Sequence, residues 1–94
     1  MDAILEILDK YSRKFKKLTN KDEYSIKKLK RKLIGELEIA LAVNLSEAVK
    51  GKVRGFIEDI KYSNDITRIL ELIDSLSSFI NDKIYENSKL MFQS

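Results

Sequence analysis

Apolar residues recur along the chain at steps of three and four, the spacing that places side chains on one face of an α-helix. Four such stripes are present, and they predict helices over 2–18, 21–43, 45–62 and 65–88. Their connections are short, which favours antiparallel packing of consecutive helices. The core positions that the stripes predict are Ile4, Leu8, Tyr11, Phe15, Leu18, Ile26, Leu29, Leu33, Leu37, Ala40, Leu41, Val49, Val53, Phe56, Ile57, Ile60, Ile66, Ile69, Leu70, Ile73, Leu76, Ile80 and Ile84.

The second predicted helix carries more apolar residues than one face needs. Ile34, Ile39 and Val43 fall outside its stripe, so its second half is apolar over most of its circumference. A helix of this kind is central in its fold or is buried against a second chain. The chain ends with a further apolar group, Met91 and Phe92. We therefore predict that these five residues form an interface with a protein partner, either a larger subunit or a second copy.

Polar residues between the stripes predict where the helices begin. Thr19 or Asn20 is expected to cap the second helix, and the stretch "YSND" at 62–65 precedes the fourth. The third helix is preceded by "NLSE", which has the spacing of a capping box with Asn44 as the cap and Glu47 as its partner.

Two glycines four residues apart complicate the third helix. Gly51 and Gly55 each cost about 1 kcal/mol relative to alanine in a helix interior. A helix break or C-cap at Gly51 is therefore favoured, and the alternative is a continuous helix whose small-residue face lets another helix or a phosphate backbone approach. The stretch "KGKVRG" is not a phosphate-binding P-loop, because Val53 follows Lys52 where serine or threonine is required.

Composition supports an all-α fold. The 94 residues include no proline and three glycines, whereas Leu, Ile, Lys and Glu are abundant. We predict one domain, residues 1–94, folded as an up-down bundle of three to four helices. The chain contains no cysteine and no long uncharged apolar stretch, so we expect a cytoplasmic protein without a membrane span.

The net charge of +3 conceals a strongly uneven distribution. Residues 10–32 hold eleven lysines and arginines against two acids, whereas the segments before and after each carry a net charge of −3. If the first two helices form an antiparallel hairpin, these cations gather at one end of it, where they bind a polyanion or an acidic partner. The candidate binding residues are Lys10, Arg13, Lys14, Lys16, Lys17, Lys21, Tyr24, Lys27, Lys28, Arg31 and Lys32.

The helical spacing separates these residues from the core. Only Lys30 lies at the edge of the apolar stripe, where its stem is expected to cover apolar surface while its ammonium stays in water. Tyr11 and Phe15 are assigned to the core rather than to base stacking. Tyr24 is left open between the two roles.

The sequence does not favour an enzyme. Histidine and cysteine are absent, no acids are spaced as a catalytic pair, and no metal-ligand spacing occurs. We therefore predict no catalytic residue, no cofactor and no metal.

The function that fits best is a non-catalytic accessory subunit of a nucleic-acid-processing complex, such as a polymerase-type assembly in DNA replication. Lysine outnumbers arginine in the basic segment, which favours contacts with DNA or RNA phosphates over recognition of bases. A homodimeric DNA-binding protein of the chromatin or regulator kind is the alternative, and a small helical enzyme is less favoured.

Overall fold

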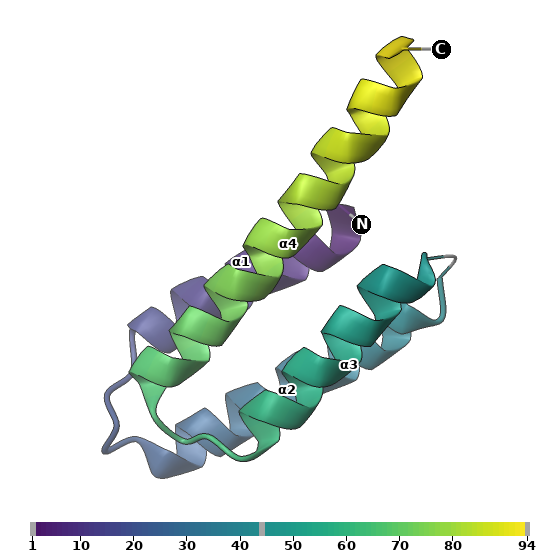
Figure 1. Cartoon of the computed structure of the whole chain (residues 1–94). Helices are drawn as coiled ribbons and strands as arrows, with labels where there is room; N and C mark the ends of the chain where they lie inside the picture. Colours follow the sequence, from purple (N-terminus) through teal and green to yellow (C-terminus); the bar gives the residue numbers. More distant parts are fainter. Residues whose placement is uncertain (1, 44, 94) are drawn as a thin grey trace.

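The protein forms a bundle of four α-helices in the computed structural model, which describes residues 2–43 and 45–93, with side chains described as far as Glu86 (Figure 1). The helices are α1 (Asp2–Lys16), α2 (Glu23–Leu41), α3 (Glu47–Lys61) and α4 (Ile66–Gln93). The described residues contain no strand, and the predicted all-α class is confirmed.

Consecutive helices run in opposite directions, so the bundle is up-down with four members (Figure 1). α1 packs against α2 and α4, and α3 packs against the same two helices. The α1–α2 and α3–α4 connections lie together at one end of the bundle, and the last turns of α4 project beyond the other helices (Figure 1). The end of α1 and the start of α2, which carry most of the basic residues, therefore lie at this end of the bundle.

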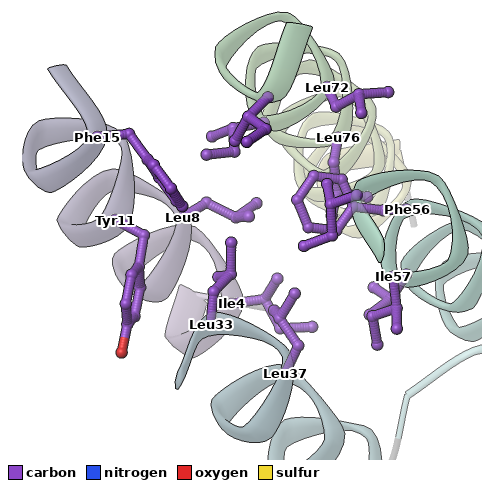
Figure 2. Packing of buried hydrophobic residues seen from close by; sticks show 14 of the residues in the cluster. Ile4, Leu8, Tyr11, Phe15, Leu33, Leu37, Phe56, Ile57, Leu72 and Leu76 are labelled. Carbon is purple, nitrogen blue, oxygen red and sulfur yellow. The ribbon is translucent and has the colours of Figure 1, made fainter. Parts of the chain in front are cut away.

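Each helix contributes its predicted stripe to one central core. Figure 2 shows side chains from all four helices converging, with Leu8 and Phe15 of α1 directed towards Leu76 of α4 and Phe56 of α3. A large apolar side chain that is fully buried contributes about 1.5–3 kcal/mol, so this cluster holds the bundle together. Tyr11 and Phe15 are 2% and 0% exposed, which confirms their assignment to the core.

The α4 stripe differs from the prediction at three positions. Leu70 and Ile84, predicted to be buried, are only half-buried, whereas Leu72 is buried and was not predicted. α4 packs against both α1 and α3, so its buried face is wider than one row and is shifted towards Leu72.

Two of the predicted helix caps are wrong. α3 begins at Glu47 with Ser46 as its N-cap, because the Ser46 hydroxyl accepts a hydrogen bond from the Val49 amide at 3.3 Å. The predicted cap, Asn44, lies outside the described residues. α2 has Asp22 at its N-cap position instead of Thr19 or Asn20, and the Asp22 carboxylate turns back to accept the Thr19 amide at 2.9 Å.

Asn20 caps a different helix from the one expected. Its side-chain oxygen accepts a hydrogen bond from the Ile66 amide in the first turn of α4, at 2.9 Å. Its amide nitrogen lies 3.3 Å from the carboxylate of Asp65, the residue before that helix. The α1–α2 turn is thus fastened to the α3–α4 turn.

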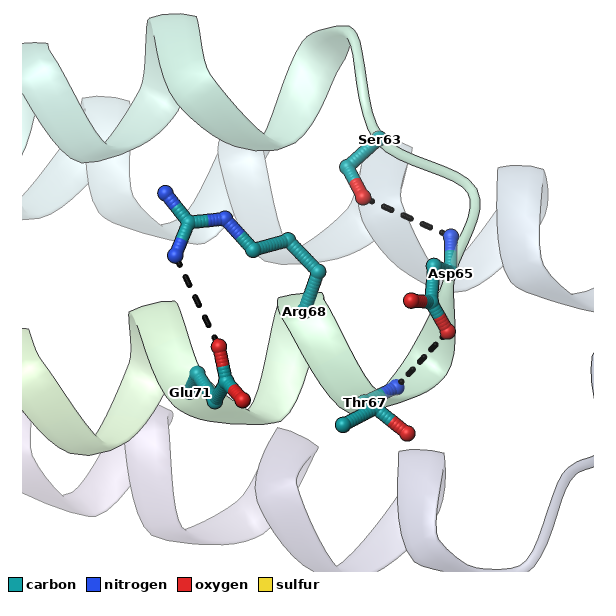
Figure 3. Close-up of polar contacts among 5 residues, drawn as sticks. All are labelled: Ser63, Asp65, Thr67, Arg68 and Glu71. Carbon is teal, nitrogen blue, oxygen red and sulfur yellow. Dashed lines mark hydrogen bonds and ion pairs between the residues drawn. The ribbon is translucent and has the colours of Figure 1, made fainter.

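Local contacts complete the start of α4, as Figure 3 shows. The Asp65 carboxylate accepts the Thr67 amide at 3.2 Å, while the Asp65 amide donates to the Ser63 hydroxyl. One turn later, Arg68 and Glu71 form an ion pair at 3.6 Å. The hydrogen bonds of the Asp65 and Thr67 amides satisfy donors that have no partner within the helix.

α3 is continuous through both glycines, so the predicted break at Gly51 is wrong. The buried stripe of this helix includes Val49, Val53 and Phe56, which flank both glycines on the core side. Burial of that stripe outweighs the low helix propensity of glycine.

Candidate polyanion-binding site

The α1–α2 hairpin brings the two basic stretches of the sequence side by side. An ion pair between the Lys10 ammonium and the Glu36 carboxylate, 2.8 Å apart, links the two helices and shows the register in which their core packing holds them. Because the helices are antiparallel, the turn of α1 that follows Lys10 faces the turn of α2 that precedes Glu36. This register implies that Lys14 lies opposite Lys32. The next turn brings Lys17, just after α1, opposite Lys28. We call these four residues the lysine rows.

The lysine rows are not neutralised by the protein. All four side chains are exposed, and none has a carboxylate partner within the part of the chain that the structure describes. Two like charges facing each other across a helix pair are unfavourable for folding. The arrangement is therefore best suited to an anionic ligand.

Glu36, the acid that pairs with Lys10 beside the rows, is already engaged. The pKa of Glu36 is lowered, chiefly by its hydrogen bond with Lys10, then by one with Tyr11, and by the charges of Lys10 and Lys14. The pKa of Tyr11 is raised to about 12, because burial and the Glu36 carboxylate both disfavour its phenolate. The Lys14 ammonium lies 5.4 Å from the Tyr11 ring centroid, which orients the lysine without cancelling its charge.

Lys30 does not belong to the basic surface, and the prediction that its ammonium stays in water is wrong. Its side chain is buried, and its ammonium donates to the carbonyls of Lys61 (3.3 Å) and Ser63 (2.6 Å) and to the side-chain oxygen of Asn64 (3.0 Å). Its pKa is lowered by burial and by the neighbouring charge of Lys27. Lys30 thus ties α2 to the end of α3, where carbonyls lack partners.

The remaining predicted cations surround the lysine rows on several faces. Lys16 lines the groove between α1 and α4, close to Asp9 and Asp74. Arg13 is paired with Asp9 at 2.9 Å, and its charge is partly offset. Lys21, Lys27 and Arg31 are exposed.

Tyr24 is 79% exposed and takes no part in the core. It precedes Lys28 by four residues and Arg31 by seven, so the three side chains follow one row along α2. An exposed aromatic ring beside cations is a feature of surfaces that bind single-stranded nucleic acid.

The predicted partner interface is divided. Ile39 and Val43 are 74% and 61% exposed at the end of the hairpin opposite the lysine rows, whereas Ile34 packs against the core. The side chains of Met91 and Phe92 lie outside the described residues.

A groove between α3 and α4 lies on the small-residue face that the sequence analysis gave as the alternative to a helix break. Gly51 and Gly55 form its floor, Phe79 borders it, and its volume is about 710 Å³. Lys52 and Lys83 lie 5.4 and 5.5 Å from the Phe79 ring centroid. The small-residue face of α3 is therefore open, as the less favoured interpretation of the glycine spacing predicted.

Within residues 2–43 and 45–93, acidic side chains do not gather in threes as a metal site would require. Among the same residues, no helix contains an apolar stretch long enough to cross a membrane. Comparisons with protein-family models, with curated proteins and with solved structures gave no match.

Proposed function

We propose that this protein is a non-catalytic binding subunit that contacts the phosphate backbone of nucleic acid through the lysine rows. The observation that carries the proposal is the exposure of Lys14, Lys17, Lys28 and Lys32 with no described acidic partner, on two helices whose Lys10–Glu36 contact implies that Lys14 faces Lys32 and Lys17 faces Lys28. Lysines neutralise phosphates and release counterions without reading the base sequence.

The proposal extends to membership of a larger assembly. The exposed side chains of Ile39 and Val43 support contact with a protein partner in addition to nucleic acid. A polymerase-type complex remains the assembly that we favour, and an acidic protein bound at the lysine rows is the alternative ligand.

Binding to a labelled DNA duplex at increasing salt tests the proposal. With four to six phosphates engaged, the slope of log affinity against log salt is expected to be about −4 to −5, and affinity should vary little between duplex sequences. Changing Lys14, Lys17, Lys28 and Lys32 to Gln should make the slope less negative by up to about 3.6.

A matched variant provides the control. Lys52, Arg54, Lys61 and Lys83 carry the same total charge on α3 and α4, and changing them to Gln should alter the slope by less than about 1. Equal losses in both variants would mean that net charge, not the lysine rows, drives binding. Failure of the wild type to bind duplex or single strand at about 50 mM salt would exclude nucleic acid and favour an acidic protein.

A further inference from the structure

An apolar groove lies between the start of α1 and the end of α2. Its volume is about 340 Å³. Exposed Ile39 of α2 and exposed Val43, two residues beyond the end of that helix, stand on one side of the groove. Its apolar lining includes Ala3, Ile7, Ile39, Ala40, Val43 and Leu45.

The groove and the lysine rows belong to one face of the hairpin. On α1, Ala3, Ile7, Lys10, Lys14 and Lys17 follow each other at steps of three and four, so they form one row. The Lys10–Glu36 ion pair is the boundary, since the groove ends at Glu36 and the lysines begin beyond it. From Ala3 to Lys17 this face is about 21 Å long.

We propose that this face binds an α-helix of a partner protein that carries apolar side chains along one half and carboxylates along the other. A groove between two packed helices accepts a third helix, and its anchors recur at steps of three and four. The apolar half would fill the groove between Ile7 and Ile39. The acidic half would meet Lys14 and Lys32.

Charge complementarity distinguishes this occupant from the others. Nucleic acid satisfies the lysines but leaves the apolar groove exposed to water. A second copy carries the same face, and a two-fold pairing over its full length would place lysines on lysines or on the groove. Only a helix that carries apolar side chains along one half and carboxylates along the other matches both the groove and the lysines. This inference does not depend on nucleic-acid binding.

The test uses a fluorescein-labelled 18-residue peptide with four leucines on one face of its first half and four glutamates on the same face of its second half. A peptide of identical composition, with these residues spread around the helix, is the control. Anisotropy titrations at 150 mM salt should show saturable binding of the first peptide and at least tenfold weaker binding of the second. No saturation below about 1 mM, or equal binding of both, overturns the proposal.

Matched protein variants locate the site. Ile39→Gln with Val43→Gln should weaken the peptide complex at least tenfold. Tyr62→Gln with Tyr85→Gln, which changes two equally exposed side chains elsewhere, should leave it within twofold. Unchanged binding in the first variant overturns the proposal. Lys14→Gln with Lys32→Gln should also weaken binding, more strongly at low salt.

Two measurements exclude the other occupants. Duplex affinity should stay within twofold in the Ile39→Gln/Val43→Gln variant, and a parallel loss would assign the groove to the nucleic-acid site and overturn the proposal. Sedimentation should show the same oligomeric state for this variant and the wild type. A wild-type dimer that the variant converts to a monomer would assign the groove to a second copy and overturn the proposal. Peptide binding without duplex binding would instead refute only nucleic-acid binding.

Discussion

Lys30 stabilises the fold, although the lysines and the arginine near it in the sequence are exposed to solvent. It is 7% exposed, whereas Lys27 and Lys28 on the same helix are open to solvent. Its ammonium supplies donors to three oxygens at the end of α3 and in the turn that follows. The positive charge also lies at the C-terminal end of a helix, where the dipole favours cations.

We expect Lys30→Met to lower the free energy of unfolding by about 1–3 kcal/mol, because the methionine keeps the apolar stem but removes the donor of three part-buried hydrogen bonds. Lys27→Met is the matched control, and as an exposed position it should change stability by less than about 0.5 kcal/mol. Urea unfolding followed by circular dichroism measures both. Equal stability of the Lys30 variant and the wild type would mean that water replaces the ammonium.

At the scale of the element, α3 illustrates the competition between helix propensity and tertiary burial. Gly51 and Gly55 lower the intrinsic stability of the helix, but Val49, Val53 and Phe56 are buried on the opposite side. A Cβ added at either glycine would meet nothing within 4 Å, because both face the open groove beside α4. The glycines are therefore not required by packing within the described bundle.

Gly51→Ala and Gly55→Ala are each expected to raise the free energy of unfolding by up to about 1 kcal/mol, since alanine has the higher helix propensity. Gly35→Ala in α2 is a suitable comparison, because its Cβ also meets nothing within 4 Å. Thermal unfolding measures the gain. A loss of stability at Gly51 alone would show that the backbone there is not helical in solution.

At the scale of the whole molecule, the dominant feature is the separation of charge along the bundle. The hairpin end carries the lysine rows, and Lys16, Lys21 and Lys27 lie near them. Two unit charges 10 Å apart in water repel by about 0.4 kcal/mol, so several such pairs cost about 1 kcal/mol or more. This repulsion is tolerated because the apolar core contributes much more.

Raising the salt concentration from about 10 to about 150 mM shortens the screening length and should increase the melting temperature, by about 4–8 °C for each 1 kcal/mol relieved. The variant with glutamine at all four residues of the lysine rows should lose most of this dependence. The variant altered at Lys52, Arg54, Lys61 and Lys83 should retain it. A melting temperature that falls with salt in the wild type would show that ion pairs such as Lys10–Glu36 outweigh the repulsion.

The candidate site was predictable in outline and not in detail. The cluster of cations and the exposure of Ile39 and Val43 followed from helical spacing. The alignment of Lys14 with Lys32 did not, because it depends on the register between two helices, which core packing sets and which the Lys10–Glu36 pair reveals across 26 residues of sequence.

The sequence alone determined the four helices and most of their buried faces, because apolar periodicity reports burial wherever one face meets the core. Tertiary structure alone decided the partners of polar groups that lie far apart in sequence. Asn20 caps α4 instead of α2, and Lys30 binds the α3–α4 turn instead of water, since both depend on which helix ends meet in space. A local pattern identifies a side chain that can donate or accept, but only the packing of the bundle brings its partner within hydrogen-bond distance.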